Sequence, residues 1–430
     1  MSRLLIKHAR VVDPSQRLDA GLDILIANGK IARLAERIED RDAEVLDGTG
    51  LVAAPGFIDL HVHLREPGFE YKETIASGAA AAAAGGFTAV CCMPNTQPVN
   101  DNAAVTEFIR TRAAEAGLAR VYPVGAISKN LEGAELAELG EMARAGAVAF
   151  SDDGKPVHNA YLMRRVLEYA QIFNVAVVDH CEDRDLAGKG VMHEGAVATR
   201  LGLRGVPAAA EEVMVARDCV LAELTGGRLH IAHLSTRGGL ENVRATKGRG
   251  VAVTCEVTPH HLALTDQAVA DSEYDTDTKM NPPLRSAEHV EALLQGVLDG
   301  TVDCLATDHA PHHSDEKALE YDLAPFGVVG LETAVPVTYD LLVRKHKLAL
   351  HRFIAHWSTN PARLFGLPGG TLKVGSPADV TLLDLDARLT VNPDRFRSAS
   401  HNTPFAGQRL KGWPAATLVG GKVVWRRERK

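Results

Sequence analysis

The 430-residue sequence has no C-x-x-C pair and no excess of positive charge. Its six cysteines lie mostly inside apolar segments, so we expect buried, reduced thiols and no thiolate zinc site. The 47 basic and 55 acidic residues give a net charge of -8. This balance argues against a nucleic acid or an anionic membrane as the main partner, and it favours a small-molecule substrate.

The sequence also lacks a long apolar run. Arg3, Lys7 and Arg10 interrupt the first segment, so no secretory signal is evident and we expect a cytoplasmic protein. The least polar long stretch, residues 75–93, is mostly alanine and glycine and is divided by Gly85 and Gly86. It predicts a packed helix followed by a strand, and not a membrane span.

The central part of the chain contains eight short runs rich in apolar and β-branched residues. Segments with helical patterns separate several of them, as at 102–116, 160–171, 208–224 and 287–298. Strands that alternate with helices pair in parallel, and eight such units predict an α/β fold, a closed (β/α)8 TIM barrel. The runs are Phe57–His63, Phe87–Met93, Val121–Ile127, Ala147–Asp152, Val175–Cys181, Leu229–Ser235, Val251–Thr258 and Asp303–His309.

The two ends of the chain have a different character. Short strand-like runs alternate with turns in residues 4–46 and 377–425, where Asn28-Gly29 and Gly420-Gly421 are hairpin signals. We expect both ends to form one small β domain, with the chain returning to it at 367–370. The predicted division assigns 1–55 and 367–430 to the β domain and 56–366 to the barrel.

His61 and His63 are the most informative pair in the sequence. Alternate residues of a strand point to the same side, so two imidazoles are aimed at one point, as metal ligands are. Two core histidines would instead need partners for their ring nitrogens, and the preceding Phe57 and Ile58 offer few. We therefore interpret the pair as metal ligands at the end of a barrel strand.

Other polar residues lie at the predicted carboxyl ends of the strands, which converge on one face of a barrel. Together they can hold two ions, with one carboxylate bridging both and a water molecule activated as the nucleophile. Strand alternation lets only one of two adjacent aspartates face inward and does not identify which. The candidate ligands are His61, His63, Asp152 or Asp153, His180, His233 and Asp308. The histidines in loops or helix-like segments are interpreted as structural, namely His158, His193, His260, His261 and His289.

Asp308 lies at the end of the eighth predicted strand. Besides metal binding, we predict a role for it in proton transfer. A carboxylate at this place can exchange a proton with the nucleophilic water as well as contact a metal. A helix N-cap role fits poorly, because Pro311 and two histidines follow where a helix would begin. The segment 310–326 is long for a βα loop, and we expect it to fold over the pocket.

Seven segments resemble one family, the bacterial dihydroorotases of the long-chain, class I type in the amidohydrolase superfamily. The resemblance spans nearly the whole chain and includes the predicted return into the β domain. The segments are GFIDLHVHLREPG at 56–68, MPNT at 93–96, FSDDG at 150–154, CEVTPHH at 255–261, KMNPPLR at 279–285, ATDHAPH at 306–312 and KVGSPAD at 373–379.

The resemblance implies zinc-dependent, reversible hydrolysis of (S)-dihydroorotate to N-carbamoyl-L-aspartate in pyrimidine (UMP) biosynthesis, with two zinc ions bridged by Asp153. The implied metal ligands are His61, His63, Asp153, His180, His233 and Asp308, and Asp308 is the implied catalytic acid/base. The implied substrate contacts are His63, Arg65, Asn95, Asn281, His312, Phe326 and Gly327. Arg65 also has an independent reason, because its guanidinium can pair with the carboxylate of dihydroorotate at two points.

One feature departs from the wider superfamily, in which many members bridge their metals with a carboxylated lysine after the fourth strand. This chain has Asp152-Asp153 there, and Lys155 is close enough in sequence to remain a candidate. Two other functions stay open: an allantoinase- or hydantoinase-like cyclic amidohydrolase, and a metal-free homologue that supports assembly of aspartate transcarbamoylase. The complete set of ligand candidates argues against the second. The expected partners are a small-molecule substrate, a second copy in a homodimer and, as in some relatives, aspartate transcarbamoylase.

Overall fold

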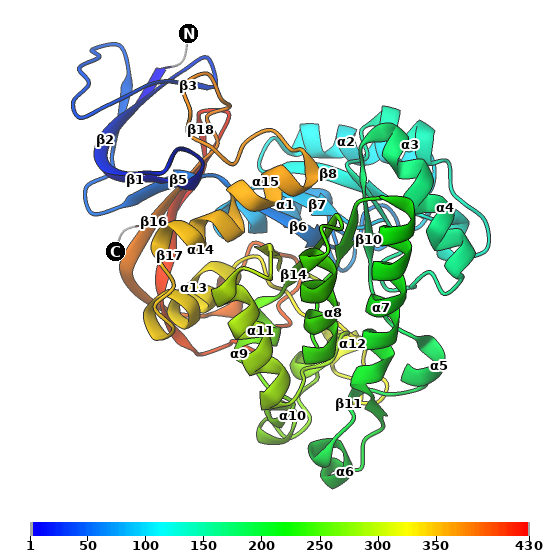
Figure 1. Cartoon of the computed structure of the whole chain (residues 1–430). Coiled ribbons are helices and arrows are strands. Elements are labelled where there is room, and N and C mark those ends of the chain that lie inside the picture. Colours follow the sequence, from blue (N-terminus) through cyan, green and yellow to red (C-terminus); the bar gives the residue numbers. More distant parts are fainter. Residues whose placement is uncertain (1–2, 429–430) are drawn as a thin grey trace.

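The computed structural model describes residues 3–428 and contains two eight-stranded sheets (Figure 1). In one of them every neighbouring pair of strands is parallel, and a bridge between Val62 and His309 joins its first edge to its last. All eight predicted runs supply a strand, so the predicted barrel is confirmed. The strands are β6 (Phe57–Val62), β7 (Phe87–Cys92), β8 (Arg120–Gly125), β9 (Ala149–Ser151), β10 (Ala176–Asp179), β13 (Leu229–Ile231), β14 (Val253–Val257) and β15 (Cys304–Leu305).

Helices surround the barrel, and local sequence signals set their ends. Asn102 and Asn159 accept backbone N–H groups at the first turns of α2 and α4, while Gly226 and Gly300 end α7 and α11 in left-handed conformations. The longer helices are α1 (Ile75–Ala84), α2 (Ala103–Ala116), α3 (Leu139–Ala145), α4 (Ala160–Ala170), α7 (Ala208–Thr225), α8 (Arg237–Gly248), α11 (Ala287–Asp299), α14 (Leu350–Trp357) and α15 (Thr359–Phe365).

Shorter elements occupy the connections. A small excursion after β10 projects from the body of the molecule (Figure 1) and consists of α5 (Arg184–Ala187), β11 (Met192–His193), α6 (Ala196–Leu201) and β12 (Gly205–Val206). The remaining short helices are α9 (Pro259–Ala263), α10 (Gln267–Asp271), α12 (Ser314–Lys317), α13 (Ala334–Thr338) and the π-helix η5 (Tyr339–Lys345).

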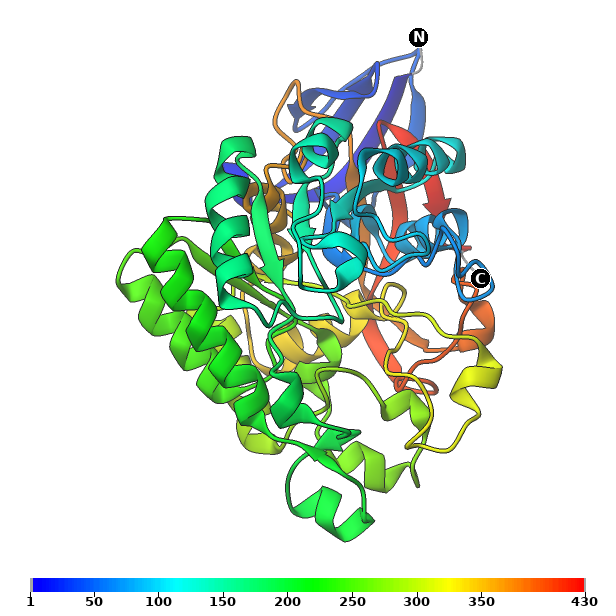
Figure 2. The ribbon, with the colours of Figure 1, turned by 90° about the vertical axis from the view of Figure 1, so that its right-hand side faces the viewer.

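The second sheet joins the two ends of the chain. β5 pairs antiparallel with β16, and this pairing connects the N-terminal strands to the C-terminal ones. A bridge between Lys30 and Pro377 adds a second link. The blue and red strands accordingly lie side by side in Figures 1 and 2. The strands are β1 (Arg3–Asp13), β2 (Leu18–Ala27), β3 (Lys30–Ala35), β4 (Glu44–Asp47), β5 (Val52–Pro55), β16 (Val380–Thr390), β17 (Arg409–Val419) and β18 (Lys422–Arg426).

Separate apolar clusters stabilise the two sheets. One large cluster lies between the barrel strands and their helices and includes Phe57, Phe87 and Trp357. Another lies on the terminal sheet and includes Ile24 and Val380, which come from opposite ends of the chain. A β domain built from both chain ends is therefore confirmed.

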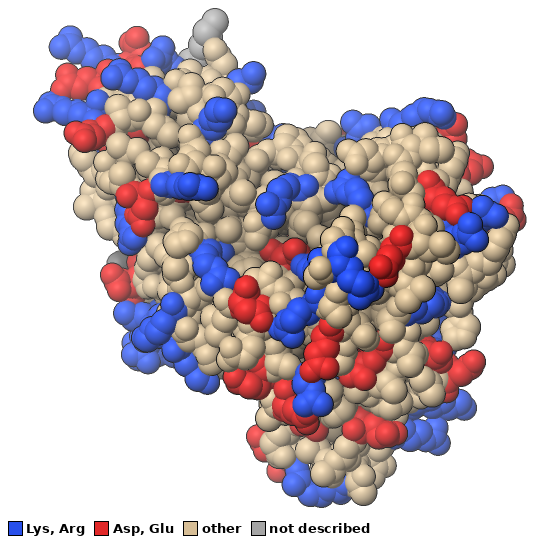
Figure 3. All heavy atoms as spheres, viewed as in Figure 1, with Lys and Arg blue, Asp and Glu red and all other residues tan. Residues whose placement is uncertain are grey.

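The cysteines are buried, as the sequence analysis predicts. All six cysteines are buried and free of disulfide bonds. Within residues 3–428, no helix has the length and apolar character needed to cross a membrane. Basic and acidic side chains are interspersed on the face shown in Figure 3.

Candidate metal centre

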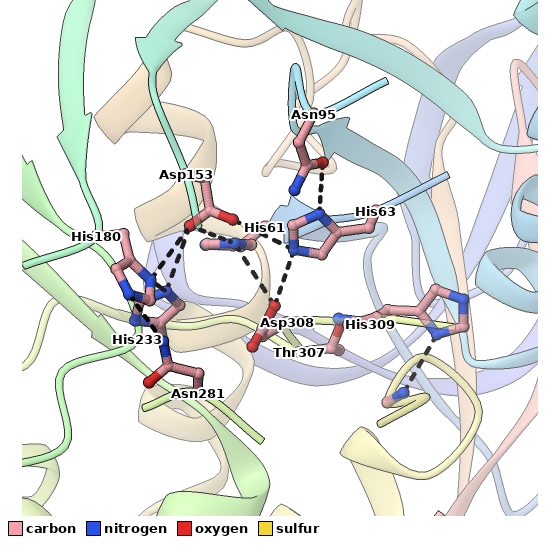
Figure 4. Close-up of polar contacts among 12 residues, drawn as sticks. His61, His63, Asn95, Asp153, His180, His233, Asn281, Thr307, Asp308 and His309 are labelled. Carbon is pink, nitrogen blue, oxygen red and sulfur yellow. Dashed lines mark hydrogen bonds and ion pairs between the residues drawn. The ribbon is translucent and has the colours of Figure 1, made fainter. Parts of the chain in front are cut away.

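The predicted ligands lie at or just past the carboxyl ends of their strands and point toward one another (Figure 4). His61 is in β6, and His63 follows its end. The others follow β9, β10, β13 and β15, namely Asp153, His180, His233 and Asp308. The barrel thus brings together six side chains from five strands that are far apart in the sequence.

Asp153 lies at the centre of this cluster. Its Oδ1 is 3.3 Å from Nε2 of His61, 3.4 Å from Nε2 of His233 and 3.7 Å from Nδ1 of His180. Its Oδ2 is 3.4 Å from Nε2 of His63. One carboxylate therefore faces all four imidazoles, which is the arrangement expected of a group that bridges two cations.

Asp308 lies on the other side of His61 and His63. Its Oδ1 is 3.1 Å from Nε2 of His63 and 3.6 Å from Nε2 of His61. The next residue, His309, points away from the cluster (Figure 4) and contacts Glu73 at 3.2 Å. Only the first of these two neighbouring titratable residues is therefore part of the site.

Several buried atoms of the cluster lack hydrogen-bond partners. They are Nε2 of His61, Oδ1 of Asp153 and Nδ1 of His233. Buried polar atoms are normally hydrogen-bonded or bound to a metal, because leaving them unpaired costs about 1–3 kcal/mol each. His61, His63 and Asp308 form one group with metal-ligand spacing, and His61, Asp153 and His233 form another. The nitrogen and oxygen donors suit zinc.

Asp152 and Lys155 point elsewhere. Oδ1 of Asp152 accepts the backbone N–H groups of Ile127 and Ser128 at 2.8 and 3.0 Å, so this carboxylate fixes the loop after β8. Burial raises the pKa of Asp152 to about 6. Lys155 is exposed. Of the three candidates for a bridging group, Asp153 alone contacts the histidines.

The carboxylates of the cluster are held ionised. Burial opposes a charge on Asp153, but the neighbouring His61 and His233 outweigh burial and keep its pKa well below the ordinary value. Burial also opposes a charge on Asp308, and hydrogen bonding to His63 outweighs it, so its pKa is lowered as well. Two ionised carboxylates beside imidazoles supply the oxygen and nitrogen donors that a divalent cation can use.

Three residues of the site adopt left-handed backbone conformations that side chains other than glycine rarely adopt. The φ angles are +62° for Arg65, +29° for His233 and +48° for Asp308. Such conformations cost about 1–3 kcal/mol each and persist where the surrounding structure imposes them, often at functional sites. Because these residues follow β6, β13 and β15, the strained turns direct side chains of the strand ends into the pocket.

Two asparagines contact the ring nitrogens of the histidines. Oδ1 of Asn95 is 2.9 Å from Nδ1 of His63, which leaves Nε2 of that ring facing the two aspartates. Nδ2 of Asn281 is 3.3 Å from Nε2 of His180. Both asparagines were predicted as substrate contacts, and both lie in the pocket, where their amides also orient the histidines.

The segment 310–326, which was expected to fold over the site, contacts Arg65. Nε of Arg65 donates to the carbonyl of Pro311 at 3.1 Å, and its NH2 group is 3.3 Å from Nε2 of His312. Nε2 of His312 is in turn 2.8 Å from the carbonyl of Phe326. Burial and the charge of Arg65 lower the pKa of His312 to about 2, so this imidazole is neutral.

Glu256 contacts His61 of the cluster, and His230 contacts Glu256. Both residues are buried, and the sequence analysis selected neither. Oε1 of Glu256 is 3.0 Å from Nδ1 of His61, and its Oε2 is 3.1 Å from Nε2 of His230. Nδ1 of His230 is 2.8 Å from the hydroxyl of Thr254. Glu256 thereby fixes the tautomer of His61 that presents Nε2 to the pocket. The available signal was a charged residue inside strand β14, whose other residues are uncharged.

Replacing Glu256 with glutamine should weaken metal binding about 10- to 100-fold, because the carboxylate that orients His61 and raises its basicity is lost. Competition with a chelator, followed by metal analysis, measures this effect. Glu223→Gln is the matched control. Glu223 lies on α7, is exposed and forms an ion pair with Arg249. Equal metal affinity in Glu256→Gln and the parent would contradict the supporting role.

Among the histidines interpreted as structural, His261 is fully paired, with Thr258 at 2.8 Å and the carbonyl of Pro282 at 2.9 Å. His193 contacts Arg285, His289 accepts the N–H of Arg237, and His158 is exposed near Asp185. His260 differs, because its buried Nε2 has no hydrogen-bond partner.

Comparison with known proteins gives a consistent result. A family profile described as "Dihydro-orotase-like" matches residues 50–239. The dihydroorotase of Anaeromyxobacter dehalogenans strain 2CP-C is 58% identical over 422 residues, which cover 98% of this chain and 97% of the relative. The dihydroorotase of Pelotomaculum thermopropionicum is 56% identical, with 98% of each chain covered.

Solved structures with the same fold include two hydantoinases. The L-hydantoinase from Arthrobacter aurescens has a TM-score of 0.88 at 27% identity and covers 100% of this chain and 97% of its own. The D-hydantoinase from Thermus sp. has a TM-score of 0.82, also at 27% identity, over 98% and 95% of the two chains. Identity is far higher to the dihydroorotases over the same length. The chain therefore belongs to the dihydroorotase family of cyclic amidohydrolases.

Proposed function

We propose that this enzyme catalyses the reversible hydrolysis of (S)-dihydroorotate to N-carbamoyl-L-aspartate, whose reverse closes the ring in pyrimidine biosynthesis. The observation that carries the proposal is the buried cluster of four histidines and two aspartates beside Arg65. The cluster supplies the ligands for a hydrolytic metal centre, and Arg65 supplies a positive partner for a substrate carboxylate.

The proposed cofactor is a pair of zinc ions. His61, His63 and Asp308 would hold one ion, His180 and His233 would hold the other, and Asp153 would bridge them. When bound, the ions polarise the amide carbonyl of the substrate and lower the pKa of a water molecule. The unpaired buried nitrogen and oxygen atoms of the cluster support this assignment.

The chain's own residues would bind and orient the ring. Arg65 would pair with the carboxylate, while Asn95 and Asn281 would add uncharged hydrogen bonds. His63, His312, Phe326 and Gly327 complete the proposed contacts. Asp308 would take a proton from the attacking water and deliver it to the ring nitrogen as the amide bond breaks, because an unprotonated amide nitrogen is a poor leaving group.

Arg65→Met should lower kcat/KM for dihydroorotate by at least about 30-fold, since losing one partner of a buried charged pair costs about 2–5 kcal/mol. Zinc content should stay unchanged. Steady-state kinetics with metal analysis tests this, and Arg37→Met, which changes an exposed arginine of the β domain, is the control. A parental kcat/KM in Arg65→Met would contradict the role of Arg65 in binding the substrate carboxylate.

The proposed function itself is tested by ultraviolet absorbance assays with dihydroorotate, hydantoin and allantoin, together with zinc analysis of the same preparation. We expect turnover of dihydroorotate and of neither other compound. We also expect the preparation to contain bound zinc. Turnover of hydantoin or allantoin in its place would assign another cyclic amide, and a metal-free, inactive protein would indicate a purely structural homologue.

The compartment, the oligomeric state, the protein partner and the domain bounds are also proposals. The enzyme would act in the cytoplasm as a homodimer and associate with aspartate transcarbamoylase, with the catalytic domain at 56–366 and the β domain at 1–55 and 367–430. Sedimentation of the purified protein, alone and mixed with the transcarbamoylase of the same organism, measures both associations.

A further inference from the structure

A C-terminal segment between η6 (Pro393–Arg395) and β17 contacts the connections that follow β6 and β14. The backbone N–H of Ala399 donates to Glu73 at 3.1 Å, and the hydroxyl of Ser400 donates to the carbonyl of Lys72 at 2.7 Å. At its other end, the N–H of Thr403 donates to Asp277 at 3.1 Å. These bonds fix residues 398–403, called here the strap, to the connections that follow β6 and β14.

Asn402 is the strap residue that reaches the proposed substrate loop. It is 6% exposed. Its Oδ1 accepts the backbone N–H of His312 at 3.3 Å, and its Nδ2 donates to the carbonyls of Gly327 at 3.0 Å and Ala310 at 3.4 Å. Its own carbonyl accepts the N–H of Val329 at 2.8 Å. One side chain therefore ties the start of the loop to its end.

Gly327 lies where the start and the end of the loop come closest. Gly327 has a φ of +133°, and a Cβ there would lie 2.9 Å from the carbonyl oxygen of Ala310, so the two limbs of the loop are in close contact. Nζ of Lys317 donates to the same Gly327 carbonyl at 3.1 Å. The Gly327 carbonyl thus accepts hydrogen bonds from both Asn402 and Lys317. These two bonds fix the orientation of the Gly327 carbonyl group.

We infer that Asn402 is a positioning residue for substrate binding: by holding the His312 N–H and the Gly327 carbonyl together, it sets the distance between two proposed substrate contacts. The inference rests on the proposed function, because that proposal assigns His312, Phe326 and Gly327 to the substrate. An amide is required, since one of its atoms accepts a hydrogen bond while the other donates.

Asn402→Asp tests this requirement with almost no change of shape. The aspartate keeps the acceptor for His312, but it places a second oxygen against the carbonyls of Gly327 and Ala310. We expect both Asn402→Asp and Asn402→Ala to raise KM for dihydroorotate about tenfold or more, with kcat changed less than about threefold and zinc content unchanged. Lys317→Met, which removes the other donor to Gly327, should shift KM in the same sense.

Ser400→Ala is the matched control, because it removes a strap hydrogen bond that does not reach His312 or Gly327. It should keep the parental KM. A parental KM in Asn402→Asp overturns the inference, and so does a KM shift of equal size in Ser400→Ala or a loss of kcat that parallels a lower melting temperature. Failure of the proposed function would look different, because the parent enzyme itself would then not hydrolyse dihydroorotate.

Discussion

Replacing Asp308 with asparagine should reduce turnover by about 10²- to 10⁴-fold in both directions, because the amide cannot carry the proton that the leaving nitrogen needs. The carboxylate lies 3.1 Å from His63 in the proposed metal centre, and its lowered pKa keeps it ionised near neutral pH. It therefore enters hydrolysis as a proton acceptor. Asparagine has nearly the same shape, so the fold should remain intact.

The test of Asp308→Asn combines initial rates of hydrolysis and of ring closure with circular dichroism, metal analysis and a pH profile. Asp315→Asn is the control, because Asp315 has the same charge, belongs to the same loop and has a side chain that is 91% exposed. Substantial residual turnover of Asp308→Asn with the parental pH profile would remove Asp308 from the proton transfer.

Replacing Asp153 with alanine should abolish activity and remove the paired metal site, since this carboxylate alone faces all four histidines of the cluster. Because Asp153 is already anionic, reconstitution should need zinc alone. Apoprotein refilled in buffer free of bicarbonate should regain the same activity as with bicarbonate, and intact mass spectrometry should detect no carboxylated lysine.

Two control variants separate metal binding from folding. Asp152→Ala should keep metal and measurable turnover but lower the melting temperature, because it leaves the buried N–H groups of Ile127 and Ser128 unpaired at about 1–3 kcal/mol each. Lys155→Ala should resemble the parent, since Lys155 is exposed. A bicarbonate requirement that Lys155→Ala abolishes would assign the bridge to the lysine instead.

The barrel could be predicted from the sequence because its strands are buried on both faces and therefore appear as short apolar runs. The positions of His61, His180, His233 and Asp308 followed from the same pattern, since parallel strands end on one face. The choice between adjacent aspartates could not be made in this way. The strand β9 ends at Ser151, so the alternation of a strand no longer applies where the aspartates begin.

The partners of residues that act through contacts far along the chain could not be predicted. Glu256 contacts His61 across 195 positions, and Asn402 contacts His312 across 90. A single polar residue carries no periodic pattern that would identify such a partner. The metal-binding, catalytic and substrate-binding roles assigned to the site residues stay predictions until the variants are measured.

The pairing of β5 with β16 has a consequence for synthesis of the protein on the ribosome. Val52 pairs with Leu383, so one edge of β5 lacks its partner strand β16 until the whole barrel has been translated. At bacterial elongation rates of about 5–20 residues per second, this interval lasts tens of seconds. During that time the edge of β5 is open to pairing with other chains. The nascent chain therefore has a period of exposure to misassembly that ends only when its last strands emerge.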